Sequence, residues 1–202
     1  NPLESSDIIN WPWMQGAPWI DVNDDGYYDI SDGDLPDMYG DFMVWYVAND
    51  ADASGHAIFG TDPLNIEMSV LQWGYIDAFN TVSLQNMIFT QVQFQNKGED
   101  QIDDMYISLW DDPDLGDAGD DFVGCDTTLS LGFCYNDGSD SDYGETPPSI
   151  GRVFLQGPIV ESPGDTAVAY GNTYPDHRNL PMSSFTKYIN GDPAYSDPYN
   201  EW

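Results

Sequence analysis

Apolar and polar positions alternate with a period of two over much of this chain. The clearest example is 88–95, IFTQVQFQ, where apolar residues interleave with glutamines. This period places alternate side chains on opposite faces of a strand. Similar runs, rich in Val, Ile, Phe, Tyr or Trp and bounded by Gly, Pro, Asn or Asp, predict further strands. The predicted strands are Phe42–Ala48, Ile66–Ile76, Asn86–Gln95, Met105–Trp110, Arg152–Val160 and Thr166–Tyr170.

No segment keeps an apolar stripe at helical spacing for long, and 19 Gly and 14 Pro residues disfavour a helical bundle. We therefore predict an all-β fold, an antiparallel β-sandwich of jelly-roll or immunoglobulin-like type with long Asp-rich calcium-binding loops. The predicted organisation has three parts. A Trp-rich segment with a calcium loop (1–41) packs on the sandwich core (42–173), and an irregular tail (174–202) leads into a longer parent chain.

The charge balance narrows the partners. The chain has four Lys and Arg residues and 36 acidic residues, which gives a formal net charge of −32. Because such a charge repels phosphate, it excludes nucleic acid as a binding partner and disfavours binding to anionic membrane surfaces. No stretch approaches the roughly 20 apolar residues of a membrane span, so no membrane insertion is expected. Of the acids, 30 are Asp and 6 are Glu, and Asp is typical of turns and metal loops. The alternative explanation of the many acidic residues is a protein surface adapted to high salt.

The stretch DVNDDGYYDISD at 21–32 has the spacing of a calcium-binding loop. Oxygen-bearing side chains occupy loop positions 1, 3, 5, 9 and 12 around a glycine at position 6. The flanks are rich in Trp, Pro and Gly, so the loop looks more like those of dockerins and thrombospondin-type repeats than a helix–loop–helix pair. An acidic solvated turn is the alternative. The predicted ligands are Asp21, Asn23, Asp25, Tyr27 through its carbonyl, Asp29 and Asp32.

Two further acidic groups are candidates for cation binding. Asp34 and Asp37, with Asp41, follow the first loop and either extend it or bind a second ion beside it. The stretch DDPDLGDAGDDFVGCD at 111–126 predicts a second metal-wrapping loop, although it matches no single template and a solvated turn is the alternative. Its candidate ligands are Asp111, Asp112, Asp114, Asp117, Asp120, Asp121 and Asp126. Asp137, Asp140 and Asp142 are weaker candidates.

Cysteines and tryptophans suggest two other features. Cys125 and Cys134, close together in sequence, predict a disulfide that closes a short loop; two buried thiols are the alternative. Trp11, Trp13 and Trp19 lie beside the calcium loop. They predict either a packed lid or interface, which we favour, or a flat platform on which sugar rings stack.

Evidence for catalysis is sparse. His56 and His177 stand far apart and outside zinc-binding spacings. No nucleophile elbow or phosphate-binding glycine loop occurs. A pair of carboxylates could serve a glycosidase, but 36 acids allow many chance pairs. We predict no catalytic residues and no enzyme activity, with a glycoside hydrolase as the least unlikely exception.

Several motifs together resemble those of a protein group. They are WPWMQGAPWIDVNDDGYYD, FMVWYVANDAD, GTDPLNIEM, MYISLWDDPDLGDAGDDFVGCDTTLSLGFCYN, YGETPPSIG and FLQGPIV. In these the chain resembles large secreted bacterial surface proteins, typical of Bacteroidota, Ignavibacteria and related phyla. Those proteins often carry C-terminal sorting tails of the type IX secretion system. The resemblance implies an extracellular or cell-surface location and a multidomain parent, but little chemistry.

These observations predict a secreted, calcium-stabilised structural or adhesive domain, with calcium as its cofactor. Calcium would neutralise Asp-rich loops that otherwise repel one another, and so let the domain pack against neighbouring domains or subunits of an extracellular assembly. Self-assembly of such domains is part of this expectation. The alternative is a carbohydrate-binding module of a secreted hydrolase, with polysaccharide as its ligand.

Overall fold

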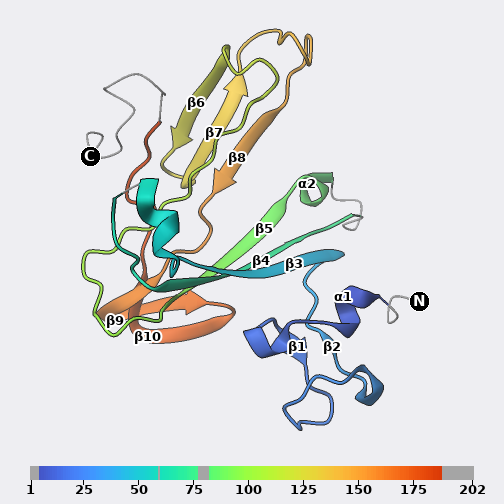
Figure 1. The fold of residues 1–202 in the computed structure, drawn as a ribbon. Coiled ribbons are helices and arrows are strands. Elements are labelled where there is room, and N and C mark those ends of the chain that lie inside the picture. The colour runs from blue at the N-terminus through green and yellow to red at the C-terminus, as the bar shows by residue number, and fades with distance from the viewer. Residues whose placement is uncertain (1–4, 59, 77–81, 188–202) are drawn as a thin grey trace. The chain divides into compact units, whose positions relative to one another are not determined.

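The computed structural model describes residues 5–58, 60–76 and 82–187 (Figure 1). Within these ranges the chain forms ten strands in antiparallel sheets and almost no helix, because α1 (Ser6–Ile9) and α2 (Val82–Gln85) have four residues each. The predicted all-β class is therefore confirmed. No described helix has the length and apolar character that crossing a membrane requires.

The chain divides into two compact units, Asn1–Tyr106 and Ile107–Trp202. The boundary between these units, after Tyr106, differs from the predicted segment limits at 41 and 173. The division into three segments stays a prediction. Four separate sheets lie within the described residues, two of them two-stranded and two of them three-stranded. Face-to-face packing of these sheets as a sandwich stays a prediction.

The first unit is built around a meander of three strands, β3 (Phe42–Asn49), β4 (Ile66–Gly74) and β5 (Ile88–Asn96). The central strand carries the core, since Val70 and Leu71 are 3% and 6% exposed and point to opposite faces. Trp73 stacks on Phe89 across the sheet, with ring centroids 5.5 Å apart. Apolar side chains on both faces are what a strand covered on both sides requires.

Before this sheet, the N-terminal segment folds on two very short strands. β1 (Trp19–Ile20) pairs antiparallel with β2 (Leu35–Pro36), and the acidic loop lies between them. A 3-10 helix, η3 (Ile30–Asp32), forms the last three residues of that loop, and Gly33 ends the helix with φ of 99°. The strand pair therefore brings the two ends of the loop together.

The second unit contains the sheet of β6 (Asp121–Asp126), β7 (Leu131–Asn136) and β8 (Ser149–Val153). Phe122 stands opposite Tyr135 on one face, with ring centroids 5.8 Å apart. A Cβ at Gly132, on the other face, would lie 2.7 Å from the ring of Phe185. Gly132 therefore admits this ring, and the second face is covered by the unit's own chain.

The same unit ends in a long hairpin, β9 (Ile159–Ala169) and β10 (Asn172–Asn179). Its two turn residues, Tyr170 and Gly171, have φ of 52° and 76°, the left-handed pair that a tight antiparallel hairpin favours. The register shifts between Pro175 and His177, as at a β-bulge.

Several strand predictions need correction. Met105–Trp110 is in no strand, although its residues favour extended structure, because strand propensity depends strongly on the packing around the segment. The run Arg152–Val160 is broken after Val153 and resumes only at Ile159. The tail was expected to be irregular from Tyr174, but β10 continues to Asn179 because it pairs with β9. Residues 188–202 of that tail lie outside the described residues.

Candidate functional site

The 21–32 loop wraps around the carboxylate of its first residue. Asp21 Oδ1 accepts hydrogen bonds from the backbone N–H groups of Asp24 (2.7 Å) and Asp25 (3.3 Å), and its Oδ2 accepts one from Gly26 (2.8 Å). Gly26 has φ of 78° and supplies the sharp turn expected at loop position 6. The chain therefore curls tightly around the Asp21 carboxylate.

Residues from both ends of the loop meet at the side chain of Asn23. Its Nδ2 donates to Asp25 Oδ2 at 3.0 Å and to Asp32 Oδ2 at 3.3 Å. Loop positions 3, 5 and 12 are thus brought together, with an amide N–H₂ group between two carboxylates. This is the position in which a cation would satisfy both carboxylates.

Asp34, another of the predicted ligands, is completely buried. Its Oδ1 accepts from the Val22 N–H and its Oδ2 from the Asp29 N–H, each at 2.9 Å. Both oxygens are thus used by the backbone of the loop. Burial, and next the charge of Asp34, raise the pKa of Tyr28, whose hydroxyl donates to the Ile8 carbonyl.

The other predicted ligands near this loop have local roles. Asp29 Oδ1 accepts from the hydroxyl and the N–H of Ser31, which lower the pKa of Asp29, and it caps η3. Asp37 donates its N–H to the Pro18 carbonyl beside the β1–β2 pair. Tyr27 donates its N–H to Asp25 Oδ1, and its side chain is 68% exposed.

Two of the three predicted tryptophans, Trp13 and Trp19, lie in an aromatic cluster with two tyrosines of the acidic loop. Trp13 meets Trp19 edge-on, with centroids 5.7 Å apart and an interplanar angle of 65°. Tyr27 and Tyr28, both from the acidic loop, contact Trp13 and Trp19 at 69° and 84°. Trp11 Nε1 donates to the Pro18 carbonyl at 3.0 Å. Edge-to-face packing favours the interior role over the stacking of sugar rings, and it joins the cluster to the loop.

The second acidic stretch, 111–126, does not close into one loop. Asp111 forms a two-point ion pair with Arg152, at 3.0 and 3.1 Å, so its charge is already compensated. Asp126 stands at the opposite end of β6 from Asp121, and it accepts from the N–H groups of Thr128 and Leu129. Five residues of strand place these two carboxylates about 17 Å apart at their backbones. They cannot share one ion.

Asp117, Asp120 and Asp121 do come together, with two residues from further along the chain. Asn136 Nδ2 donates to Asp120 Oδ1, and Asp140, which is 4% exposed, accepts from the N–H groups of Asp117, Asp142 and Tyr143. The N–H of Asp117 and the other bonds lower the pKa of Asp140. Gly116 leaves room for this carboxylate, since a Cβ there would lie 2.3 Å from Asp140 Oδ1.

This group holds uncompensated charge. Desolvation and then the charges of Asp140, Asp117 and Asp121 raise the pKa of Asp120. Asp121 Oδ2 accepts from the Leu115 N–H at 2.9 Å, but its buried Oδ1 has no hydrogen-bond partner. A buried polar atom without a partner is costly. For Asp112 and Asp114 the structure gives exposed positions before this group.

The predicted disulfide is not formed in the structure. Cys125 and Cys134 are free thiols on neighbouring strands, and the register pairs Cys134 with Val123 and Cys125 with Gly132. The cysteines are therefore diagonal neighbours, whose Cβ atoms stand farther apart than the roughly 4 Å of a disulfide. Burial, followed by the nearby charge of Asp121, raises the pKa of Cys134.

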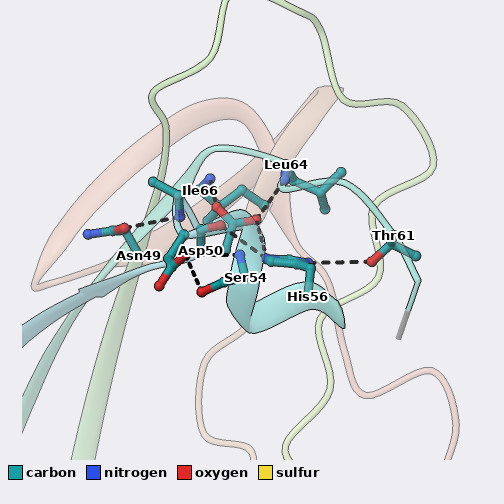
Figure 2. Close-up of polar contacts among 9 residues, drawn as sticks. Asn49, Asp50, Ser54, His56, Thr61, Leu64 and Ile66 are labelled. Carbon is teal, nitrogen blue, oxygen red and sulfur yellow. Dashed lines mark hydrogen bonds and ion pairs between the residues drawn. The ribbon is translucent and has the colours of Figure 1, made fainter. Parts of the chain in front are cut away.

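One polar constellation was not singled out from the sequence (Figure 2). Asp50 accepts from the N–H groups of Leu64 (2.6 Å) and Ile66 (2.8 Å), and so closes the excursion between β3 and β4. His56 lies 3.0 Å from the Asp50 carbonyl through Nε2 and 3.4 Å from Thr61 Oγ1 through Nδ1. Desolvation raises the pKa of Asp50, but the two N–H groups and His56 outweigh it, so the net pKa is lowered.

This constellation has the residue types of a catalytic triad without its geometry. In a catalytic triad the hydroxyl of Ser54 would form a hydrogen bond with the base His56. Here that hydroxyl instead donates to Asp52 at 2.7 Å, which is a local turn contact. The side chains act as a loop closure. Only an alignment of homologues could have marked Asp50 from sequence, because its partners are backbone groups.

Among the described residues, no group of three or more His, Cys, Asp or Glu side chains forms a metal centre. The 21–32 loop assembles two carboxylates and an amide, and the second unit an acidic group with one unpartnered oxygen. No protein-family model matches the chain, and neither the curated proteins nor the solved structures contain a match. The resemblance to secreted bacterial surface proteins therefore stays a prediction.

Proposed function

We propose that this chain is a calcium-stabilised structural or adhesive domain of a secreted protein, located outside the cell or on its surface. It would pack against neighbouring domains or subunits of an extracellular assembly. Within this proposal the antiparallel sheets pack face to face as a sandwich, which the apolar side chains on both faces of the β3–β4–β5 sheet support.

One observation carries the proposal: loop positions 3, 5 and 12 converge on one point. Asn23 Nδ2 lies within hydrogen-bond distance of Asp25 Oδ2 and Asp32 Oδ2. If the amide turns by half a rotation, its oxygen joins the two carboxylates and an ion replaces the N–H₂ group. Such a set of oxygen ligands suits calcium, whose coordination geometry is variable, better than magnesium, which demands a strict octahedron.

The charge of the whole chain supports the same conclusion. Residues that carry 36 negative charges face four that carry positive charge, and the described residues contain ion pairs of Lys97 with Glu67 and Arg152 with Asp111. Self-repulsion of this size destabilises a compact state unless cations bind or screen it. In the second unit, a cation beside Asp121 Oδ1 would compensate the unpartnered oxygen.

Carbohydrate binding, the alternative function, receives less support. A sugar-stacking platform needs an exposed, flat aromatic face, whereas Trp13 and Trp19 are half-buried and meet edge-on at 65°. Because two rings of the cluster belong to loop residues, tryptophan fluorescence should respond to changes in the conformation of the loop.

Isothermal titration of the full chain with calcium chloride, after chelator treatment, tests the proposal. We expect binding, and we expect Asp32→Asn to weaken it about tenfold through loss of one charged ligand. Asp24→Asn is the matched control: it removes the same charge from the same loop at a position outside the ligand pattern. Absence of calcium binding to the wild-type chain, or equal effects of the two variants, would contradict the proposal.

A further inference from the structure

Asp34 differs from every other acidic residue near the 21–32 loop. It is 0% exposed and is the largest fully buried side chain among the described residues. A carboxylate is costly to bury unless hydrogen bonds replace its lost water. Both of its oxygens accept backbone N–H groups at 2.9 Å, so the geometry meets this requirement.

The two N–H groups come from either side of the turn at Gly26. Val22 is its second residue and Asp29 its ninth, and Asp34 also donates its own N–H to the Asp29 carbonyl at 3.3 Å. One buried side chain thus ties together the two arms that carry Asn23, Asp25 and the turn at Gly26.

The tie continues into the strands. Asp34 directly precedes β2, and Asp21 directly follows β1, so the paired strands hold the base of the same loop. Trp19 of β1 contacts Tyr28 of the loop. The pairing of β1 with β2 therefore holds the two ends of the loop together, and the Asp34 carboxylate holds Val22 and Asp29 together within the loop.

We propose that Asp34 is a positioning residue and not a cation ligand: it holds the 21–32 loop closed before calcium arrives, and so sets the affinity of the loop for calcium. The effect on affinity rests on the proposed function. A loop that is already ordered loses less conformational entropy on binding, so its apparent affinity is higher. A carboxylate with both oxygens committed to N–H groups has little reason to leave them for an ion.

The matched pair of variants is Asp34→Asn and Asp24→Asn. Each removes one negative charge from the same neighbourhood, but only the first removes an acceptor oxygen of the closure. Asp24 has φ of 60°, a conformation that Asn adopts readily, and its side chain lies on the exposed surface. A general effect of charge would therefore appear in both variants.

The experiment is amide NMR of the full chain, first with EDTA and then during titration with calcium chloride. In EDTA we expect the Val22 and Asp29 amides of the wild type to be protected from hydrogen exchange, and Asp34→Asn to lose this protection. During the titration we expect the Gly26 amide to respond, with a midpoint about tenfold higher in Asp34→Asn, as loss of one charge-assisted hydrogen bond implies. Asp24→Asn should leave protection unchanged and shift the midpoint much less.

The outcomes separate the inference from the proposed function. Unprotected Val22 and Asp29 amides in wild-type EDTA samples would overturn the closure. Normal protection with equal calcium midpoints in both variants would leave Asp34 a stabiliser of the fold and overturn its role in affinity. If the Gly26 amide of the wild type ignores calcium, the proposed function fails at this loop, the effect on affinity is overturned with it, and the exchange data alone decide the closure.

Discussion

The two acidic regions of this chain have similar compositions and different structures. In the 21–34 region, one buried carboxylate and a two-stranded pair close the loop, and its polar side chains converge on Asn23. In the 111–126 region, β6 separates Asp121 from Asp126, and the group that does form includes Asn136, at the end of β7, and Asp140 beyond it. Spacing within a short loop determines local geometry, whereas acids that precede a strand are assembled by sheet register.

The largest expected effect is the loss of the closure in the first unit. Asp34→Ala should lower the free energy of unfolding by about 3 kcal/mol, because the backbone N–H groups of Val22 and Asp29 lose their charged acceptor in a partly buried site. Asp24→Asn, at an exposed site whose φ of 60° Asn adopts readily, should change it by less than about 0.5 kcal/mol. Chemical denaturation followed by tryptophan fluorescence measures both, and equal effects would contradict the distinction.

A similar change in the second unit tests whether it also depends on one carboxylate. Asp140→Ala removes the acceptor of three N–H groups from Asp117, Asp142 and Tyr143, and we expect its melting temperature to fall by roughly 5 °C. Asp142→Ala is the control, since that side chain is exposed. Calorimetry of the full chain would show the shift, and a melt unchanged in both variants would remove Asp140 from the account.

A smaller effect concerns pH. Because the pKa of Asp120 is raised in the folded chain, its protonation stabilises the fold as pH falls through that pKa, and its charge is unfavourable above it. Asp120→Asn should therefore raise the melting temperature at neutral pH in EDTA by a few degrees. The melting temperature of this variant should also differ less between neutral and mildly acidic pH than that of the wild type. A fall in melting temperature at neutral pH would show that Asp120 is not repelled by its neighbours.

The smallest effect is chemical. Without reductant, an Ellman titration of the unfolded chain should detect both thiols. In the folded chain Cys134 should react with iodoacetamide more slowly than Cys125, because it is buried and its pKa is raised. Detection of no thiol in the unfolded chain would restore the disulfide, and with it a different register of β6 and β7.

Much of the first unit could be predicted from the sequence. The strong alternation along 88–95 and the runs at 42–48 and 66–76 became β5, β3 and β4 with ends displaced by one or two residues. The loop at 21–32 was recognisable because its geometry depends on neighbours within twelve residues. In both cases the sequence signal is local: alternation within each run for the strands, and spacing within twelve residues for the loop.

The second unit was harder to predict for physical reasons. β6 and β7 read DFVGCD and LGFCYN, and their Gly and Asp residues hide the strand pattern, although Gly132 is there to admit the Phe185 ring. The importance of Asp140 depends on a sheet that places it near Asp117, 23 residues earlier. The burial of Asp34 was equally invisible, since its partners are backbone groups and carry no residue signature.

Thermal unfolding of the chain as purified without chelator, with its metal content measured by mass spectrometry, tests the central claim most directly. We predict bound calcium, and a melting temperature that falls on addition of EDTA and recovers with calcium chloride. A hundredfold excess over the dissociation constant stabilises by about 2.7 kcal/mol for each site. Absence of calcium together with an unchanged melt in EDTA would contradict the claim and leave the acidic surface as an adaptation to salt.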